Sequence, residues 1–539
     1  MKLRPFLLAA ALCAAPPLAA QNTSSAAPQA SPVDRIIDEG ANRSQVMLTA
    51  QHLTDVIGPR LTNSPQMRAA EEWTAAKFRE WGLANVRKEG FPFGRGWSIE
   101  RSSVRMVSPR PLQLTAIPIA WTPAGNVTAP IVVAPMKRER DFDRYRGQLR
   151  GKIVLVSEPG TGSEPKEPAF QRLSDADIAK LDEFEQPRFD PDRLAKQFRD
   201  EAFAAKRDAF LKAEGAVALA TISYRDGKLL HGEGYQFETG GSPTLPAVQL
   251  AAEDYRRLAR LAKTGPAPTL EIVSDVRYHD EDPNAYNVIA EIPGTDPRAG
   301  YVMAGAHLDS WVAGDGAADN AAGSAMIMEA ARILVATGAR PRRTIRFALW
   351  NGEEQGLLGS YAYVDKYLAK RGAPGSPPLR GVNTYYAFGN AWPITPLPGY
   401  RDLAAYFNID NGSGKLRGLY AEGNPGAAST FREWLAPLSS MGAGSVVMSR
   451  TGGTDHLFLQ QIGLPGFQFI QDPLDYETRV HHSSADTFDH LKADDMRQGS
   501  IVLAHVLLSA ANAKDLLPRP PLPTRPVVTD PFAYPEADD

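Results

Sequence analysis

From residue 287 onward, short runs of apolar residues alternate with longer amphipathic stretches. Residues 287–292, 301–306 and 344–350 are apolar runs of strand length, and residues 320–337 have the apolar spacing of a helix. This alternation is typical of an α/β fold, in which a mostly parallel sheet has helices on both faces. The pattern therefore predicts such a domain over residues 281–516.

Upstream of this domain the pattern of apolar residues changes twice. Residues 35–110 contain two helical patterns followed by strand-like alternation, and we expect them to form the N-terminal part of the same domain. Residues 111–280 hold separate short strands and one charged helical stretch, without clustered acidic or histidine residues. They are interpreted as an inserted, β-rich module that supports the fold or guides a substrate. Residues 517–539 contain seven prolines and are predicted to form a non-helical tail.

The first 20 residues have the pattern of a secretory signal peptide. Lys2 and Arg4 precede an apolar stretch, and the small residues Ala19 and Ala20 provide a cleavage site. Residues 21–34 are rich in Ser, Ala, Pro and Gln and predict a flexible leader. The expected location is therefore the periplasm or the extracellular space. Cleavage would remove Cys13, the only cysteine, although lipid anchoring at Cys13 is an alternative.

Composition and charge exclude several classes of function. A chain with 43% hydrophobic and 22% charged residues is an ordinary globular protein. Its net charge of −3 does not provide the basic surface that nucleic-acid binding needs. No apolar run after the N-terminus approaches the roughly 20 residues of a transmembrane helix. Without a cysteine in the mature chain, thiol proteases and thiolate metal sites are excluded. The oligomeric state stays open, with a homodimer among the options.

Acidic and histidine residues recur where the predicted strands end. In chain order they are His307, Asp309, Glu353, Glu354, Asp410, Asp455, His456, His481, His482 and Asp486. Because ligands of such sheets bind at the carboxyl ends of the strands, these side chains are expected to meet at one edge. For Asp455 two interpretations stay open: it contacts a substrate, or it holds His456 or the adjacent turn.

Two histidines and three carboxylates suit a two-metal hydrolase. Zinc binds imidazole nitrogen and carboxylate oxygen, and a carboxylate can bridge two ions about 3.5–4 Å apart. Asp319 is the natural bridge, because it directly precedes a helix in a Gly- and Ala-rich segment. In the tandem Glu353-Glu354, one carboxylate can bind metal while the other acts as general base. Asp309 is placed to accept the second imidazole N–H of His307.

Six ordered motifs resemble those of the co-catalytic di-zinc exopeptidases. They are GAHLDS (305–310), GAADNAAG (316–323), WNGEEQGLLGS (350–360), NIDNG (408–412), GGTDH (452–456) and HHSSADT (481–487). That family contains bacterial zinc aminopeptidases and glutamate carboxypeptidases. The motifs are most similar to the plasma glutamate carboxypeptidase (carboxypeptidase Q) branch, and the resemblance covers roughly residues 285–515.

The resemblance implies two Zn²⁺ ions per chain and a role for each motif residue. The implied set is His307 and Asp410 on one zinc, Glu354 and His482 on the other, Asp319 as bridge, Glu353 as general base and Asp309 as partner of His307. It also implies that the inserted module is a protease-associated domain. His482 is favoured over His481 because its four-residue offset to Asp486 matches the family spacing. Many relatives have Tyr where this chain has His481, which is therefore expected to be the oxyanion donor.

The expected activity is hydrolysis of a terminal peptide bond of a peptide or dipeptide. Aminopeptidase and carboxypeptidase or dipeptidase specificity both remain open, with Arg450 and Arg479 as candidate partners of a substrate carboxylate. A single-zinc transferase similar to glutaminyl cyclases is an alternative, as is a binding module that has lost catalysis. The aromatic-rich stretch 371–400 is a hypothetical cover of the site. Five histidines lack partners of this strand-end kind and are interpreted as structural: His52, His231, His279, His490 and His505. His279 precedes Asp280, Glu281 and Asp282, but because this run lies in a predicted linker, a solvated charge run is favoured over a metal cluster.

Overall fold

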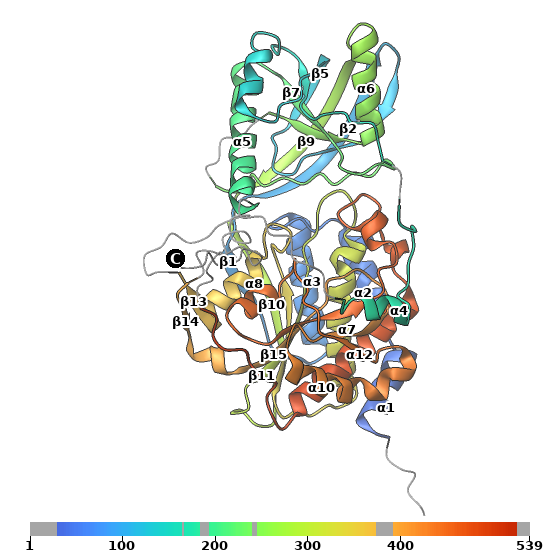
Figure 1. The fold of residues 1–539 in the computed structure, drawn as a ribbon, viewed down its shortest axis with the longest axis vertical. Helices are drawn as coiled ribbons and strands as arrows, with labels where there is room; N and C mark the ends of the chain where they lie inside the picture. Colours follow the sequence, from blue (N-terminus) through green and yellow to red (C-terminus); the bar gives the residue numbers. More distant parts are fainter. Residues whose placement is uncertain (1–29, 164–165, 184–192, 240–244, 373–391, 525–539) are drawn as a thin grey trace, which may run out of the picture.

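The computed structural model describes residues 30–163, 166–183, 193–239, 245–372 and 392–524, which form two stacked α/β units (Figure 1). The large unit consists of residues 30–95 and 280–524, and the insert consists of residues 96–279. The predicted signal peptide, most of the predicted leader and the end of the Pro-rich tail lie outside the described residues.

The large unit is built on an eight-stranded sheet. Its strands, from edge to edge, are β1 (Ala84–Pro92), β10 (Asn284–Ile292), β12 (Thr344–Trp350), β11 (Tyr301–His307), β15 (Leu403–Asn408), β18 (Gly466–Gln471), β16 (Leu416–Tyr420) and β17 (Ser445–Val447). The four central strands, β12, β11, β15 and β18, are parallel, whereas β1, β10 and β16 join antiparallel. The sheet is therefore mixed, with a parallel centre. An apolar pattern indicates which face of a strand is buried but not the direction of the strand, so the antiparallel edges were not predicted.

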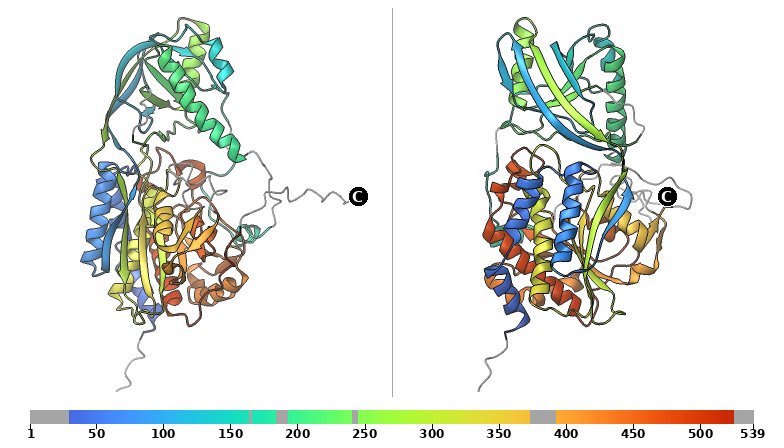
Figure 2. Two further views of the ribbon diagram at one scale, coloured as in Figure 1. Left: turned by 90° about the vertical axis from the view of Figure 1, so that its left-hand side faces the viewer. Right: turned by 180° about the vertical axis from the view of Figure 1, so that it is seen from behind.

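Helices cover both faces of this sheet, as predicted (Figure 2). On one face lie α1 (Pro32–Asn42), α2 (Val46–Gln51), α3 (Pro65–Glu80), α7 (Ala322–Ala336), α10 (Pro425–Leu435) and α12 (Ala493–Asn512). On the other lie α8 (Leu358–Tyr363) and α11 (Leu457–Gln461), with the short ribbon of β13 (Ala369–Arg371) and β14 (Ile394–Pro396). Of the stretch 371–400, residues 373–391 lie outside the described residues, so its proposed covering role is untested.

The insert has a second eight-stranded sheet with two long helices, α5 (Arg193–Ala213) and α6 (Ala252–Thr264). Its strand order is β3 (Leu112–Leu114), β2 (Gly96–Ser108), β9 (Thr269–His279), β5 (Gly125–Val133), β6 (Ile153–Leu155), β7 (Ala218–Ile222), β8 (Ala247–Leu250) and β4 (Ala116–Pro118). β2 pairs with β9 over almost its whole length. The insert therefore begins near Gly96 and not at residue 111, because the long-range pairing partner of β2 cannot be read from its own sequence.

One arm of the insert returns to the large unit. Gln171 and Leu474 exchange two backbone hydrogen bonds of 2.7 and 2.9 Å. Beyond this bridge, α4 (Asp175–Lys180) lies beside the large unit in Figure 1, where Ile178 packs on Val447 and Ile470. The arm therefore attaches the insert to the large unit near the end of β17.

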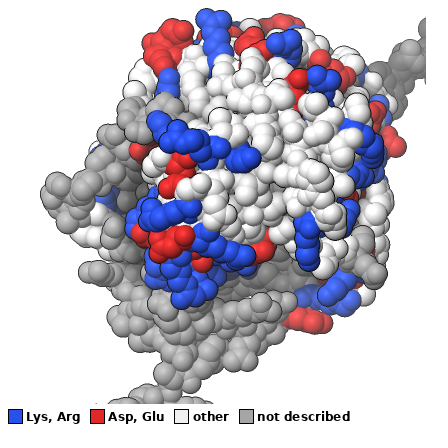
Figure 3. Space-filling model, turned by 90° about the horizontal axis from the view of Figure 1, so that it is seen from above, with Lys and Arg blue, Asp and Glu red and all other residues white. Residues whose placement is uncertain are grey.

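Two features of the described residues bear on a membrane or nucleic-acid partner: the length and apolarity of the helices, and the charge on the surface. In the described ranges no helix combines the length and apolarity needed to cross a membrane. The end of the insert seen in Figure 3 carries acidic and basic residues intermixed around a largely uncharged centre. That face does not present the continuous basic patch expected of a protein that binds nucleic acid.

Candidate metal centre

The first group of ligand-type side chains gathers around His307, the last residue of β11. Its Nε2 lies 3.2 Å from Oδ1 of Asp319 and 3.3 Å from Oδ1 of Asp410. Asp410 follows β15, the neighbouring parallel strand, and Asp319 lies in the short helical turn Ala317–Ala321 that precedes α7. Parallel strands that end at the same edge thus bring these residues together.

A second group gathers on the other oxygen of Asp319. Nε2 of His482 lies 3.2 Å from Oδ2 of Asp319 and 3.0 Å from Oε2 of Glu354. The neighbouring His481 is more distant, with its Nε2 3.7 Å from the same Asp319 oxygen. The two carboxylate oxygens of Asp319 therefore face two separate groups, which is the arrangement that a bridging ligand requires.

Four buried atoms at this place lack a hydrogen-bonding partner among the described residues. They are His307 Nε2, Asp319 Oδ2, Glu354 Oε1 and Asp410 Oδ1. Buried polar atoms are normally paired, so four unpaired atoms that converge on one point call for an explanation. Imidazole nitrogen and carboxylate oxygen are ligands of zinc, and the residues present therefore fit metal ions.

The electrostatics of the cluster also fit a cation. Burial raises the pKa values of Glu353 and Glu354 well above their ordinary range, and neighbouring carboxylates raise them further. Burial would lower the pKa of His307, but Asp410 and Glu353 raise it well above the ordinary value. Burial also opposes ionisation of Asp319, yet its contact with His307 and the charge of His482 lower its pKa. Divalent cations would offset this concentration of negative charge.

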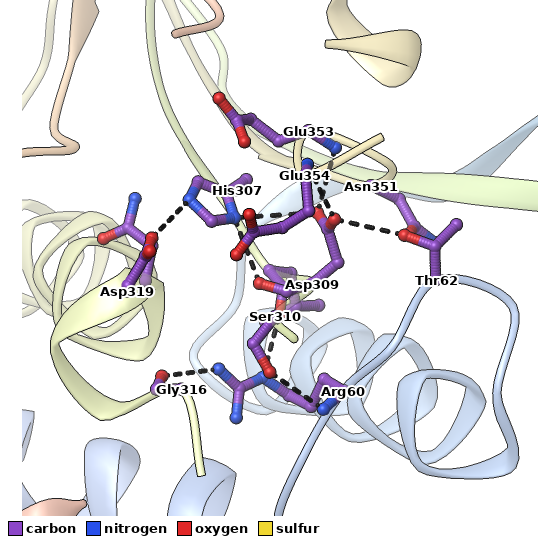
Figure 4. Close-up of polar contacts among 12 residues, drawn as sticks. Arg60, Thr62, His307, Asp309, Ser310, Gly316, Asp319, Asn351, Glu353 and Glu354 are labelled. Carbon is purple, nitrogen blue, oxygen red and sulfur yellow. Dashed lines mark hydrogen bonds and ion pairs between the residues drawn. The ribbon is translucent and has the colours of Figure 1, made fainter. Parts of the chain in front are cut away.

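Asp309 holds the backbone of the adjacent residues Glu353 and Glu354 in place (Figure 4). Its completely buried carboxylate accepts hydrogen bonds from the backbone N–H groups of Glu353, at 3.3 Å, and Glu354, at 3.2 Å. Thr62 donates a third, at 3.1 Å. Nδ1 of His307 lies 3.0 Å from the backbone carbonyl of Asp309 and 3.7 Å from its carboxylate. The second N–H of His307 is thus directed by the Asp309 main chain, and the carboxylate positions the two glutamates.

Asp486 holds the backbone of Asp319, the proposed bridging residue. Its buried carboxylate accepts from the backbone N–H groups of Ala318, at 2.6 Å, and Asp319, at 3.0 Å. These bonds fix the turn that carries Asp319. Burial raises the pKa of Asp486 well above its ordinary range, and the charge of Asp319 adds to this rise.

Arg60 was not predicted from the sequence, although it organises the loop below the site (Figure 4). Its fully buried guanidinium donates five hydrogen bonds to backbone carbonyls, those of Leu53, Gly58, Leu308, Asp315 and Gly316. Burial lowers the pKa of Arg60 to about 10. A lone Arg in a loop 250 residues before the site carries no local pattern that could have revealed this role.

We expect Arg60→Met to destabilise the fold by at least about 3 kcal/mol, because five buried carbonyls lose a charged donor. Chemical denaturation monitored by circular dichroism would measure the loss. Arg35→Met, which removes an exposed guanidinium bonded to one carbonyl, is the control. Equal unfolding midpoints for the two variants would show that the Arg60 network is not needed.

The metal centre opens into a cleft of about 350 Å³. Its lining comes mainly from the ends of the central strands, with one contribution, Tyr235, from the insert: Tyr235, Asp319, Glu353, Glu354, Gln355, Gly356, Leu357, Asp410, Asn411, Gly452, Gly453, Thr454, Tyr476, Glu477, His481 and His482. None of these described lining residues is Lys or Arg. A larger hollow lies around Arg172 and Lys415, away from this chemistry.

The three residues considered from the sequence for contact with a substrate, Asp455, Arg450 and Arg479, are not among the described residues that line the cleft. Asp455 is completely buried, and burial raises its pKa to about 7, against a hydrogen bond from Ser360 that lowers it. Its absence from the described cleft lining disfavours contact with a substrate, and no hydrogen bond between its carboxylate and His456 or the adjacent turn is found among the described residues. Arg450 and Arg479 are also not among the described lining residues, so neither is placed to pair with a substrate carboxylate in this structure.

The interpretation of His231 as an isolated structural histidine was wrong about its surroundings. Its ring stacks on that of His482, with centroids 4.8 Å apart and an interplanar angle of 17°. Edge-on contacts with Trp311 and Tyr224 complete its environment. His231 and His482 are 251 positions apart in the sequence and belong to different units, so a search for partners at strand ends could not identify this contact.

Comparison with known proteins relates this chain to a family. The model of peptidase family M28 matches residues 287–507, which contain every residue of the two groups. Over residues 287–507 the chain is therefore similar to peptidase family M28. The prediction of a metallopeptidase from the di-zinc exopeptidase family is thereby confirmed.

Known proteins resemble this chain over most of its length. Carboxypeptidase Q of Mus musculus is 26% identical over 471 residues, which cover 87% of this chain and 86% of that protein. The crystal structure of a peptidase M28 precursor from Shewanella amazonensis has a TM-score of 0.62 at 24% identity and covers 91% of this chain and 98% of its own. A zinc aminopeptidase from Bacillus subtilis has a TM-score of 0.55 at 18% identity, covering 87% and 95%. Because these alignments extend far beyond residues 287–507, the shared fold includes most of the insert.

Proposed function

We propose that this protein is an M28 exopeptidase that works with two zinc ions. The observation that carries the proposal is the position of Asp319 between two groups, His307 with Asp410 and His482 with Glu354. When bound there, zinc supplies Lewis acidity toward the scissile carbonyl and makes water acidic enough to attack it at neutral pH. The zinc aminopeptidase from Bacillus subtilis, which shares the fold, supports the choice of metal.

Glu353 is the proposed general base. It lines the cleft next to the ligand Glu354, and Asp309 holds the backbone of both glutamates. Its carboxylate would take a proton from the attacking water and return it to the leaving amine.

His481 is the proposed donor to the developing oxyanion. Its side chain is 30% exposed, lines the cleft and lies beside the bridging Asp319. Burial lowers its pKa, which favours a neutral ring with one N–H to donate.

We expect His481→Phe to lower kcat by up to about 100-fold, because the ring remains but its donor is lost. Steady-state kinetics would measure this effect, and zinc analysis of the same sample would check that the metal content is unchanged. His481→Gln, which keeps a donor, should retain more activity than His481→Phe. Equal activity of the two variants would contradict the assignment.

The lining of the cleft supports recognition of a free α-ammonium group. Besides the ligands and the base it carries Glu477, and none of the described lining residues is Lys or Arg. Such a site attracts the cationic end of a peptide, and its described lining has no Lys or Arg to form an ion pair with a carboxylate. We therefore favour aminopeptidase or dipeptidase action, both of which require a free amino terminus.

We expect N-acetylation of a dipeptide substrate to lower kcat/KM by about 10–100-fold, the value of one charge-assisted hydrogen bond. The measurement compares free, N-acetylated and C-amidated forms of one dipeptide. Cleavage of the C-amidated form indicates an aminopeptidase, and loss of cleavage in both blocked forms indicates a dipeptidase. Undiminished cleavage of the N-acetylated form would favour a carboxypeptidase and reject this preference.

The proposal also covers the number of zinc ions, the identity of the insert and the export of the protein. A single-zinc transferase is disfavoured because the ligands of both groups are present, and a count of one zinc per chain would reverse this judgement. The insert is proposed to be a protease-associated domain, a resemblance supported by its position ahead of β10. Export to the periplasm or beyond rests on residues 1–20, and N-terminal sequencing of the mature protein would test it.

A further inference from the structure

A loop of the insert takes part in the metal centre. Residues 223–239, here called the insert loop, follow the carboxyl end of β7 and reach the large unit. Tyr235 of this loop lines the catalytic cleft, and His231 packs its ring against His482. The insert thus supplies side chains to a site whose proposed ligands all come from the large unit.

The ring of His231 is held by contacts with other rings, and neither of its nitrogens makes a hydrogen bond within the described residues. The side chain is buried, at 2% exposure. The nearest charged atom is Oε2 of Glu233, 3.1 Å from Nδ1. A buried polar ring without hydrogen bonds is costly, so this position needs a compensating contribution. Besides the contact with Glu233, the ring makes a nearly parallel contact with His482, at 17°, and edge contacts with Trp311, at 86°, and Tyr224, at 69°.

The two histidines of the proposed zinc sites differ in how their rings are oriented. His307 is directed by the hydrogen-bond contact of its Nδ1 with the Asp309 carbonyl. For His482 no such hydrogen bond is found within the described ranges, its side chain is 29% exposed, and it lies on a loop with a positive φ of 50°. Ligand histidines are normally oriented by a second contact. For His482 the neighbouring rings of His231, with centroids 4.8 Å apart, and His481, at 3.8 Å, are placed to provide it.

The main chain around His231 is anchored to both units. Its N–H donates to Oε1 of Gln249 in β8, at 2.6 Å. The preceding Leu230 donates to Oγ of Ser484, at 3.1 Å, and its carbonyl accepts from the N–H of Ser484, at 2.8 Å. Ser484 is two residues from His482. The next residue, Gly232, has a φ of +74° that favours glycine. The position of the His231 ring relative to His482 is therefore fixed by short connections.

We propose that His231 is a positioning residue, supplied by the insert, whose ring holds the imidazole of His482 in the orientation needed to bind zinc. This proposal rests on the proposed di-zinc function. It makes the insert a structural part of the metal centre: the zinc site on His482 and Glu354 would depend on docking of the insert loop.

The test compares His231→Leu with His231→Phe in the full-length protein. Leu fills the space without a planar ring, whereas Phe keeps the stacking face without ring nitrogens. Competition with a chromophoric chelator would measure the affinities of both zinc ions. We expect His231→Leu to weaken one of the two by on the order of 10–100-fold, and His231→Phe to remain within about threefold of the wild type. Activity of His231→Leu should recover in excess zinc, which would not occur if the substitution only damaged the fold.

Two further variants complete the design. His279→Ala removes another insert histidine, one that contacts Ser98 in β2, and should leave both zinc affinities unchanged. Ser484→Ala removes the acceptor for Leu230 and should weaken the same zinc ion by a smaller factor. Unchanged zinc affinities in His231→Leu, with two zinc ions in the wild type, would overturn this proposal alone. Equal weakening in His231→Phe and His231→Leu would also overturn it, because the ring nitrogens would then matter. A wild type without zinc would overturn the proposed function itself.

Discussion

Replacing Glu353 by Gln is expected to lower kcat by about 10²–10⁴-fold, with little change in KM or in zinc content. Gln has nearly the same size and keeps the backbone N–H that donates to Asp309 at 3.3 Å. The amide cannot take a proton from the attacking water, so only the chemical step should suffer. Steady-state kinetics with metal analysis of the same preparation would measure both quantities.

The control for this substitution is Glu433→Gln on α10, which makes the same chemical change at an exposed position far along the chain from the site. It should match the wild type in both measurements. Retention of more than about a tenth of the wild-type kcat in Glu353→Gln would reject Glu353 as the general base. If Glu353→Gln instead lost zinc, Glu353 would be a zinc ligand and Glu354 would be the general base.

The parts of the fold that could be predicted are those encoded locally. The apolar runs 301–306 and 344–350 appear as β11 and β12, and helices are present in residues 35–110, where two helical patterns were expected. The ligand-type residues could be selected because they follow such strands directly. Because neighbouring parallel strands end at the same edge of the sheet, residues that directly follow different strands lie close together in space.

The parts that could not be predicted depend on distant partners. The membership of β2 in the insert follows from its ladder with β9, more than 160 residues later. Arg60 and His231 lie on loops outside the motifs at the strand ends, and their contacts are with carbonyls and rings that folding brings to them. Residue type and spacing therefore predict the proposed metal ligands, whereas the groups that orient those residues emerge only from the tertiary structure.

Asp319→Asn should have an effect at least as large as the loss of the base. The carboxylate of Asp319 faces His307 with one oxygen, at 3.2 Å, and His482 with the other, also at 3.2 Å. An amide can offer one oxygen but carries no charge, so one group loses its shared ligand and both lose a negative charge. The backbone N–H groups of Ala318 and Asp319 still bond to Asp486, which should keep the turn folded.

We therefore expect Asp319→Asn to bind one zinc ion or fewer per chain and to lose about 10³-fold or more in kcat, equivalent to about 4 kcal/mol of Lewis-acid stabilisation. Metal analysis after dialysis and steady-state kinetics would measure the two effects. Asp494→Asn, whose side chain is 94% exposed, is the matched control and should keep both zinc ions. Because the carboxylate is shared, the two effects should appear together. Two zinc ions with full activity in Asp319→Asn would reject the bridge, and with it the two-metal reading of this cluster.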